Sequence, residues 1–389
     1  MSIKDKIKIL EDGALKNLEK KYGKEAFYLG NKKIPSVPLI CSSGSIALDH
    51  ALCIGGFPEG RVIEIGGQES SGKSTLTLLN IAEIQRNEKL CAYIDVEQSF
   101  DPTYAQRLGV DVENLLISQP ETMEETFEIL FELISSKVIS YIVVDSTNAM
   151  IPEKMLKGDT DTALMGKSAL LMSQQLPKVV SLASTNKCTV VFISQVRSKI
   201  GVVYGSPEKI GVGEALKFYA SQRLKVNKSD IQKDDYEGQD SVDITVTVFK
   251  NKVGVPYRKA SFTLLTGKDG EYGIDKMKEI IEFAIKYDIV KKAGSWYSFG
   301  EERLGQGLPN VKKFFQENPT IYTQVEQQIK DNLAKEREKL MSIESFDSKV
   351  SDIADAINDK RRKKKDEKVE KVVEVQEQPE IKEAEIVEG

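Results

Sequence analysis

The sequence predicts an α/β protein whose centre is a mostly parallel β-sheet covered by helices on both faces. Two observations lead to this prediction. Between Val37 and Leu265, short runs of apolar and β-branched residues alternate with helical stretches. A glycine-rich loop directly follows one of these runs and precedes a helix, an arrangement typical of phosphate-binding loops.

Composition excludes several classes of protein. The chain has 389 residues, enough for two or three domains, and 40% of them are hydrophobic. Collagen, wholesale disorder and a disulfide-stapled mini-protein are therefore excluded. No apolar run approaches the ~18 residues of a membrane helix. The start lacks the features of a signal peptide, so we expect a cytoplasmic protein without a membrane partner.

Charge and cysteine content restrict the partners further. The net charge of −5 gives no global attraction to nucleic acid, so any DNA binding must come from a local patch. The four cysteines form no C-x-x-C pair, and the chain has one histidine, which disfavours a zinc site. We expect reduced, partly buried thiols.

The strands of the central region fall into two groups. Residues 61–66, 90–95, 141–145 and 188–194 form β-rich runs, with helical stretches at 74–87 and 121–135. Strands separated by helices predict a parallel sheet. Residues 223–226, 242–250 and 260–265 follow without long helices between them, and the second run alternates apolar and polar side chains. We expect these runs to form an antiparallel extension of the same sheet.

The two ends of the chain are predicted to be separate parts. Residues 5–30 are predicted to form a helix with Leu10, Ala14, Leu18 and Tyr22 on one face. Within an N-terminal segment 1–36, this helix is either an arm that packs on a neighbour or a helix on its own core. Residues 271–334 predict a small α+β domain. Residues 335–389 predict a charged tail that is either mobile or becomes helical with a partner.

A phosphate-binding loop is the clearest functional motif. Residues 67–75, GQESSGKST, match G-x-x-x-x-G-K-[ST] between a strand and a helix. Glycines let backbone N–H groups approach phosphates, and the helix N-terminus adds partial positive charge. Lys73 can reach the β- and γ-phosphates of ATP, and the Ser74 hydroxyl can ligate Mg²⁺. The candidate nucleotide-binding residues are Gly67, Gln68, Glu69, Ser70, Ser71, Gly72, Lys73, Ser74 and Thr75.

Polar side chains at the ends of three further apolar runs are candidates for catalysis. Asp145 ends YIVVD, where a carboxylate downstream of a phosphate loop is expected to hold Mg²⁺. Glu97 follows another run and is either the group that activates water or a solvent-facing loop residue. Gln195 is either a sensor of the γ-phosphate or an ordinary loop amide. The segment after Gln195 is glycine-rich and basic, as suits a DNA backbone, although a flexible surface loop has the same composition.

The ordered set of motifs resembles the bacterial RecA recombinase family. GQESSGKSTLTL, IDVEQSFDPTYAQRLGVD, LLISQP, YIVVDS, FISQVRSKIGVVYG, EALKFYAS and FKNKV occur in the same order as in that family. The resemblance covers about residues 13–334. Single motifs of this kind occur in many P-loop ATPases, whereas the ordered set is specific.

The resemblance implies a RecA-type ATPase core at 37–270 with two DNA-binding loops, about 153–167 and 195–213. It implies ATP and Mg²⁺ as cofactors, DNA-dependent ATP hydrolysis, and a helical homo-filament on single-stranded DNA. This filament would pair with homologous duplex DNA and exchange strands in recombinational repair. Self-cleaving repressors and loading factors are further implied partners. The N-terminal helix would be the polymerisation arm, and the C-terminal domain a surface where duplex DNA enters.

The resemblance also assigns roles to single residues. Asp145 would support the metal, Glu97 would activate water, and Gln195 would sense the γ-phosphate. Lys250 and Lys252 would reach the ATP of the adjacent protomer. The remaining implied contacts are Asp101 and Tyr104 with the adenine, and Met165, Ser173, Arg197, Lys199, Ile200, Gly211 and Gly213 with DNA.

Some residues depart from the family pattern, and two other functions remain open. Leu170 and Pro177 stand where we expect arginines that bind DNA, Val212 stands in a usual glycine pair, and Pro177 should kink its helix. The alternatives are a hexameric helicase-like ATPase and a regulatory filament subunit without strand exchange. KNK at 250–252 and the N-terminal helix favour filaments over rings. The intact set of Lys73, Glu97 and Asp145 argues against a non-enzymatic subunit.

Overall fold

The computed structural model describes residues 1–23, 37–156, 164–198, 208–210, 214–228, 241–267 and 270–341. The chain forms two compact units, Met1–Pro38 and Leu39–Gly389. In the first unit, α1 (Ile3–Leu10), the π-helical segment η1 (Glu11–Leu15) and α2 (Lys16–Tyr22) follow one another, and none of their residues is buried. Ser2 and Asp5 form a capping box that starts α1. The predicted helix is confirmed up to Tyr22, and its part at 24–30 lies outside the described residues.

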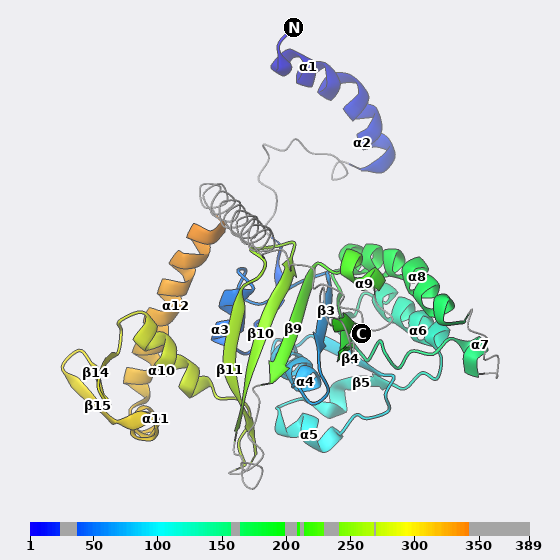
Figure 1. The fold of residues 1–389 in the computed structure, drawn as a ribbon. Coiled ribbons are helices and arrows are strands. Elements are labelled where there is room, and N and C mark those ends of the chain that lie inside the picture. The colour runs from blue at the N-terminus through cyan, green and yellow to red at the C-terminus, as the bar shows by residue number, and fades with distance from the viewer. Residues whose placement is uncertain are drawn as a thin grey trace, which may run out of the picture. The chain divides into compact units, whose positions relative to one another are not determined.

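A large, mostly parallel sheet dominates the second unit (Figure 1). Its strand order is β12-β11-β10-β9-β3-β7-β6-β4-β5, and β8 pairs with β7. The part from β9 to β5 is parallel, and β10 to β12 extend it antiparallel, which confirms the predicted fold class. The strands are β3 (Val62–Gly67), β4 (Leu90–Asp95), β5 (Leu115–Ser118), β6 (Ile139–Asp145), β7 (Thr189–Ser198), β8 (Glu208–Ile210), β9 (Gln222–Lys228), β10 (Ser241–Asn251), β11 (Lys259–Thr266) and β12 (Tyr272–Ile274).

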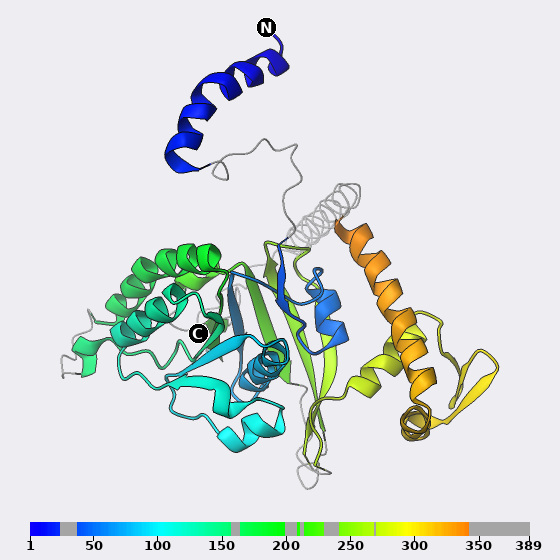
Figure 2. The ribbon, with the colours of Figure 1, turned by 180° about the vertical axis from the view of Figure 1, so that it is seen from behind.

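Two hydrophobic cores cover the two faces of this sheet. Tyr141 and Val143 of β6 point into the core that contains α3 and α4, whereas Ile142 and Val144 point into the core of α6, α8 and α9. This alternation is the period of two that a strand buried on both faces requires. Figures 1 and 2 show α6, α8 and α9 grouped together beside the parallel strands. The remaining elements of this part are β1 (Leu39–Cys41), α3 (Ile46–Ala51), β2 (Phe57–Pro58), α4 (Lys73–Gln85), α5 (Pro102–Arg107), η3 (Val112–Asn114), α6 (Met123–Ser135), α7 (Glu153–Leu156), α8 (Leu164–Asn186) and α9 (Glu214–Tyr219).

The small C-terminal domain has a hydrophobic core of its own, formed by residues such as Ile281, Leu304 and Phe315. β12 belongs to the large sheet, so the sheet extends beyond the predicted boundary at residue 270. The last helix runs beyond residue 335, where the tail was predicted to start, and Leu340 near its end is buried. The elements of the domain are α10 (Lys276–Lys286), β13 (Lys291–Ala293), β14 (Trp296–Phe299), β15 (Glu302–Gln306), α11 (Gly307–Glu317) and α12 (Pro319–Met341).

Other expectations can be compared directly with the structure. All four cysteines are free and buried, which confirms the predicted thiols. Helix α8 continues through Pro177 as a single element. Within the described ranges, no helix combines the length and the apolar character that crossing a membrane demands.

Candidate nucleotide site

The phosphate loop lies between the end of β3 and the start of α4, as predicted. Gly67 has no room for a side chain, because a Cβ would lie 2.5 Å from both Ser71 Oγ and the carbonyl oxygen of Val226. Gly72 has a φ of +92°, in the left-handed region that glycine adopts without strain. The Ser71 hydroxyl is buried and has no hydrogen-bond partner among the described residues. An unpaired donor inside this loop fits a phosphate oxygen as its partner.

Lys73 is buried beneath this loop. Its ammonium group donates a hydrogen bond to the carbonyl oxygen of Gln68, with a distance of 2.6 Å. Burial lowers the pKa of Lys73, and the carboxylates of Asp145, Glu97 and Glu69 oppose this shift. The side chain therefore faces the loop interior, where the phosphates of a nucleotide would lie.

Asp145, at the end of β6, receives two hydroxyl donors on the same oxygen. Ser74 Oγ and the Tyr93 hydroxyl each donate to Asp145 Oδ2 over 2.6 Å. Asp145 is only 4% exposed, and this burial raises its pKa, while the two hydrogen bonds oppose the rise. A hydroxyl and a carboxylate in contact are the hard oxygen ligands that Mg²⁺ prefers, so the residues fit this metal. The contribution of Tyr93 was not predicted.

Glu97 and Gln195 lie together, although Glu97 follows β4 and Gln195 lies within β7. Gln195 Nε2 donates to Glu97 Oε1 over 2.9 Å, and the Ser146 hydroxyl donates to the same oxygen. Asn148 fixes the backbone of Gln195 with two hydrogen bonds. Its Oδ1 accepts from the backbone N–H of Gln195 at 2.7 Å, and its Nδ2 donates to the backbone carbonyl oxygen of Gln195 at 3.4 Å. Ser146 and Asn148 were not predicted; their position just after Asp145 was the available signal.

A cavity of about 340 Å³ lies beside the phosphate loop. Tyr104 lines it and shares a hydrogen bond of 2.9 Å with Thr75. Asp101 is the N-cap of α5, where its carboxylate accepts from the backbone of Thr103 and Tyr104. Asp101 thus fixes the helix that carries Tyr104. Residues of β10 and β11 also line this cavity, among them Val242, Ile244 and Leu264. The sequence analysis did not predict that these residues belong to the site.

Lys250 and Lys252 lie away from the phosphate loop of their own chain. A β-bulge in β10 after Val248 brings Lys250 opposite Arg223 of β9, at the level of Glu64 on β3. The bulge turns Lys250 from the face covered by α4 to the face covered by α9. There Lys250 Nζ donates to the carbonyl oxygens of Lys217 and Phe218, at 2.6 Å and 3.0 Å.

Most of the predicted DNA contacts cannot be placed. Ser173 lies in α8 and its hydroxyl donates to the carbonyl oxygen of Ala169 over 2.8 Å. Leu170 is 57% exposed. Only the backbones of Met165 in α8 and Arg197 in β7 are described. The other predicted contacts, Lys199, Ile200, Gly211 and Gly213, lie outside the described residues.

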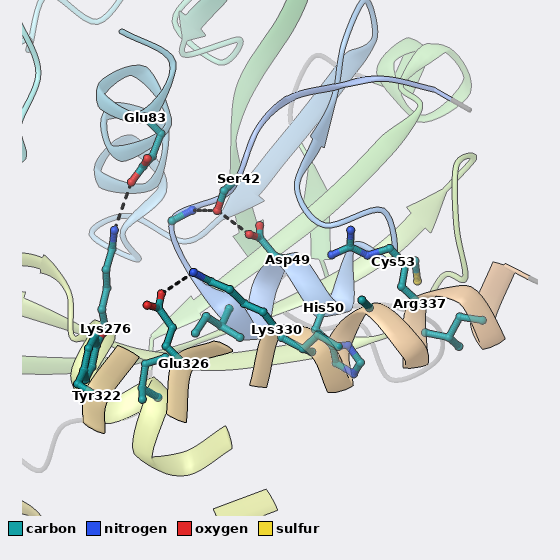
Figure 3. A pocket seen from close by; sticks show the side chains of 16 residues that line it. Ser42, Asp49, His50, Cys53, Glu83, Lys276, Tyr322, Glu326, Lys330 and Arg337 are labelled. Carbon is teal, nitrogen blue, oxygen red and sulfur yellow. Dashed lines mark hydrogen bonds and ion pairs between the residues drawn. The ribbon is translucent and has the colours of Figure 1, made fainter. Parts of the chain in front are cut away.

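A second cavity, of about 500 Å³, separates the core from α12 (Figure 3). Its charged groups largely pair with one another: Lys276 lies 3.3 Å from Glu83, and Lys330 lies 2.9 Å from Glu326. Asp49 accepts a hydrogen bond of 2.5 Å from the hydroxyl of Ser42. The pair of Lys276 on α10 and Glu83 on α4 connects the two domains beside this cavity, and the nucleotide site remains at the phosphate loop.

Two family models and several known proteins match this chain. The family model of the RecA N-terminal domain matches residues 8–271, and that of the RecA C-terminal domain matches residues 278–334. The chain is 45% identical over 321 residues to Protein RecA of Leptospira meyeri, with 82% of each chain covered. It is also 45% identical over 323 residues to Protein RecA of Chlorobaculum tepidum, covering 82% of this chain and 91% of the relative. Protein RecA of Acinetobacter baumannii is 44% identical over 323 residues, covering 82% and 90%.

Proposed function

Since the chain belongs to the RecA family of DNA recombinases, we propose that one protomer supplies the phosphate loop, Asp145, Glu97 and Gln195, and that the next supplies Lys250 and Lys252. As a member of this family, the protein is a DNA-dependent ATPase that uses ATP with Mg²⁺. It binds single-stranded and duplex DNA, forms homo-filaments, and acts in recombination, DNA repair and the SOS response.

The observation that carries the proposed site is a connected set of hydrogen bonds between four strand ends. Ser74, directly after the β3 loop, contacts Asp145 on β6, and Ser146 continues to Glu97 beyond β4. Glu97 then contacts Gln195 on β7. The carboxyl ends of parallel strands are where ligands bind in such sheets. All of these groups therefore face one nucleotide.

Each group has a proposed role in binding or hydrolysis. Lys73 and the backbone N–H groups of the loop bind the β- and γ-phosphates, and the Ser71 hydroxyl gains a partner there. Ser74 and Asp145 hold Mg²⁺, which when bound neutralises charge on the phosphates. Tyr93 keeps its hydrogen bond to Asp145 and so orients the carboxylate.

Glu97 accepts the proton of the attacking water in this proposal. Ser146 and Gln195 both donate to Oε1 of Glu97, which fixes the carboxylate and leaves Oε2 available for water. Because Asn148 locks the backbone of Gln195, only its side chain can respond to the γ-phosphate. Tyr104 binds the adenine in the cavity beside the loop.

Lys250 and Lys252 are assigned to the neighbour's ATP because of their position in the sheet. Lys250 is level with Glu64, three residues before Gly67, which is about 10 Å along a strand. It also points to the face opposite α4. Their cations would neutralise charge on the phosphates of the adjacent protomer.

The experiment that tests this site measures ATP hydrolysis with and without single-stranded DNA. We expect strong stimulation by DNA in the native protein and none in Lys73→Ala. Glu97→Gln should bind ATP and assemble on DNA as the native protein does, but should lose hydrolysis by about a hundred-fold or more. Hydrolysis that persists in Glu97→Gln would contradict the role of Glu97. Activity in Lys73→Ala would contradict the whole site.

The proposal extends to DNA, location and a regulatory partner. We propose that the segments 153–167 and 195–213 contact single-stranded DNA, with Ser173 beside the first of them. We place the protein in the cytoplasm, where bacterial DNA and ATP are available to it. We also propose that its DNA-bound filament stimulates self-cleavage of repressors; a repressor that stays intact with active filaments would refute this.

A further inference from the structure

A row of charged side chains crosses three neighbouring strands behind the nucleotide site. Glu64 on β3 is in register with Arg223 on β9, and Arg223 is in register with Lys250 on β10. The Arg223 Nε donates a hydrogen bond to Glu64 Oε2. Glu64 is 1% exposed and the Arg223 side chain 17% exposed, so this ion pair is largely shielded from water.

The outer end of the row is fixed in place from two sides. Lys250 and Lys252 both reach the carbonyl oxygen of Phe218, at 3.0 Å and 3.5 Å. Asn251 points to the other face, where its Nδ2 donates to the carbonyl oxygen of Leu52 at 3.0 Å. Gln222 also donates to Asn251, at 3.3 Å. The backbone between the two lysines is thus anchored in the core, and the side chains of both lysines lie on the face of the sheet that α9 covers.

The charges of this row are unequal. Glu64 is the acidic member, against the cations of Arg223, Lys250 and Lys252. Burial lowers the pKa of Lys250, the charges of Lys252 and Arg223 lower it further, and Glu64 opposes the shift. An uncompensated Arg223 would therefore repel the two lysines and displace their ammonium groups.

Stability alone is a poor explanation for this ion pair. Oε1 of Glu64 is buried and has no hydrogen-bond partner among the described residues. A buried ion pair that leaves a lone pair unsatisfied contributes little to folding and often less than apolar side chains of similar volume. The structure thus retains a buried carboxylate at a cost, beside the two lysines proposed for the neighbour's ATP.

We propose that Glu64 is a positioning residue for ATP hydrolysis, which acts through Arg223 to keep Lys250 and Lys252 aligned for the ATP of the adjacent protomer. This inference rests on the proposed function of the two lysines. Glu64 touches neither nucleotide nor DNA in this role. Its loss should therefore damage the neighbour's active site and leave the ATP site of its own chain intact.

Mixed filaments test this directional effect. Glu64→Gln filaments should hydrolyse ATP at about a tenth of the native rate, and the protein should still bind ATP normally. Glu97→Gln cannot hydrolyse ATP but carries intact lysines. In an equal, random mixture, half of the protomers can hydrolyse and half of those have a Glu97→Gln neighbour. If Glu97→Gln neighbours supply working lysines to Glu64→Gln protomers, the mixture should hydrolyse ATP at about a quarter of the native rate. If Glu64→Gln instead damages the ATP site of its own chain, the mixture should reach only about a twentieth.

Control mixtures separate this inference from the function on which it rests. Lys250→Ala mixed with Glu97→Gln should also be rescued; if it is not, the proposed role of Lys250 fails. If that pair is rescued but Glu64→Gln with Glu97→Gln is not, the positioning role alone fails. Glu59→Gln removes a carboxylate of another ion pair, with Lys89, and should keep the native rate. Glu64→Asp should restore part of the activity.

A second variant tests the inference if the Glu64→Gln protein does not fold. If Glu64→Gln does not fold, Glu64→Asp replaces it, because the shorter side chain keeps the buried charge and weakens the link to Arg223. A mixture with Glu97→Gln that exceeds half the rate of Glu64→Asp alone supports the inference, and a mixture at half that rate overturns it.

Discussion

Glu279 makes the stability of the C-terminal domain depend on pH. It lies on α10, is 1% exposed, and accepts hydrogen bonds from Ser45 Oγ at 2.5 Å and from the backbone of Ile46 and Ala47 at 3.2 Å. These bonds connect the domain to the start of α3. Burial raises the pKa of Glu279 from 4.5 to about 7, against the effect of the hydrogen bonds.

The sign and size of the effect follow from this shift. The folded state holds the proton up to about pH 7, whereas the unfolded state releases it near pH 4.5. The stabilisation is therefore complete below pH 4.5 and is lost as the pH rises through 7. Between pH 5 and pH 8 the loss amounts to about 2.5 kcal/mol. Asp49, whose pKa is raised to about 6 by burial, acts in the same direction, and His50, whose pKa is lowered to about 4, acts in the opposite one.

Glu279→Gln isolates this contribution, because the amide does not titrate. Urea unfolding followed by the fluorescence of Trp296 reports on the C-terminal domain, since the chain has one tryptophan and it lies in β14. The difference in unfolding free energy between native protein and variant should change by about 2.5 kcal/mol from pH 5 to pH 8. The exposed Glu302→Gln, on β15 of the same domain, serves as the matched control. Parallel pH profiles for native protein and Glu279→Gln would refute the reasoning.

Two further predictions concern the nucleotide site. Tyr93→Phe removes a buried hydroxyl donor from the Asp145 carboxylate; charge-assisted bonds of this kind contribute about 1.5–3 kcal/mol, so affinity for ATP with Mg²⁺ should fall ten-fold or more in a binding titration. Unchanged affinity would show that Tyr93 does not orient Asp145. Gly67→Ala places a Cβ 2.5 Å from the carbonyl oxygen of Val226 and should abolish ATP binding, whereas Gly66→Ala meets nothing closer than 3.6 Å and should bind normally. Equal binding by both variants would contradict this account of the loop.

The parallel part of the sheet was predictable because its strands are buried on both faces. β4, β6 and β7 read as nearly continuous apolar runs, and their predicted bounds are close to those observed. β12 and β5 gave no comparable signal. Both strands are short, and Leu116 of β5 is 47% exposed at the sheet edge. A strand that buries little apolar surface has little hydrophobic pattern to detect.

Some residues of the candidate site were predictable from the sequence, and others were not. Lys73 and Asp145 follow from their own chemistry and from the strand ends on which they lie. Tyr93, Asn148 and Glu64 act through partners far away in the sequence, and no pattern of residue spacing in the sequence predicts those contacts. Their roles depend on the register between strands, which the structure supplies.

The bulge in β10 shows how one local irregularity decides which face of the sheet a lysine side chain occupies. Val246 and Val248 point into the core beside α4, and strict alternation would send the side chain of Lys250 there too. The extra residue turns Lys250 to the face of α9 instead. The site's other groups lie at the carboxyl ends of β3, β4 and β6 and on β7, so we assign these lysines to the ATP of the adjacent protomer. In the proposed mechanism, hydrolysis therefore needs a second protomer, and α9, which contacts both lysines, begins directly after the proposed DNA-binding segment 195–213. One short helix thereby connects the DNA-binding segment with the two lysines assigned to the neighbour's ATP.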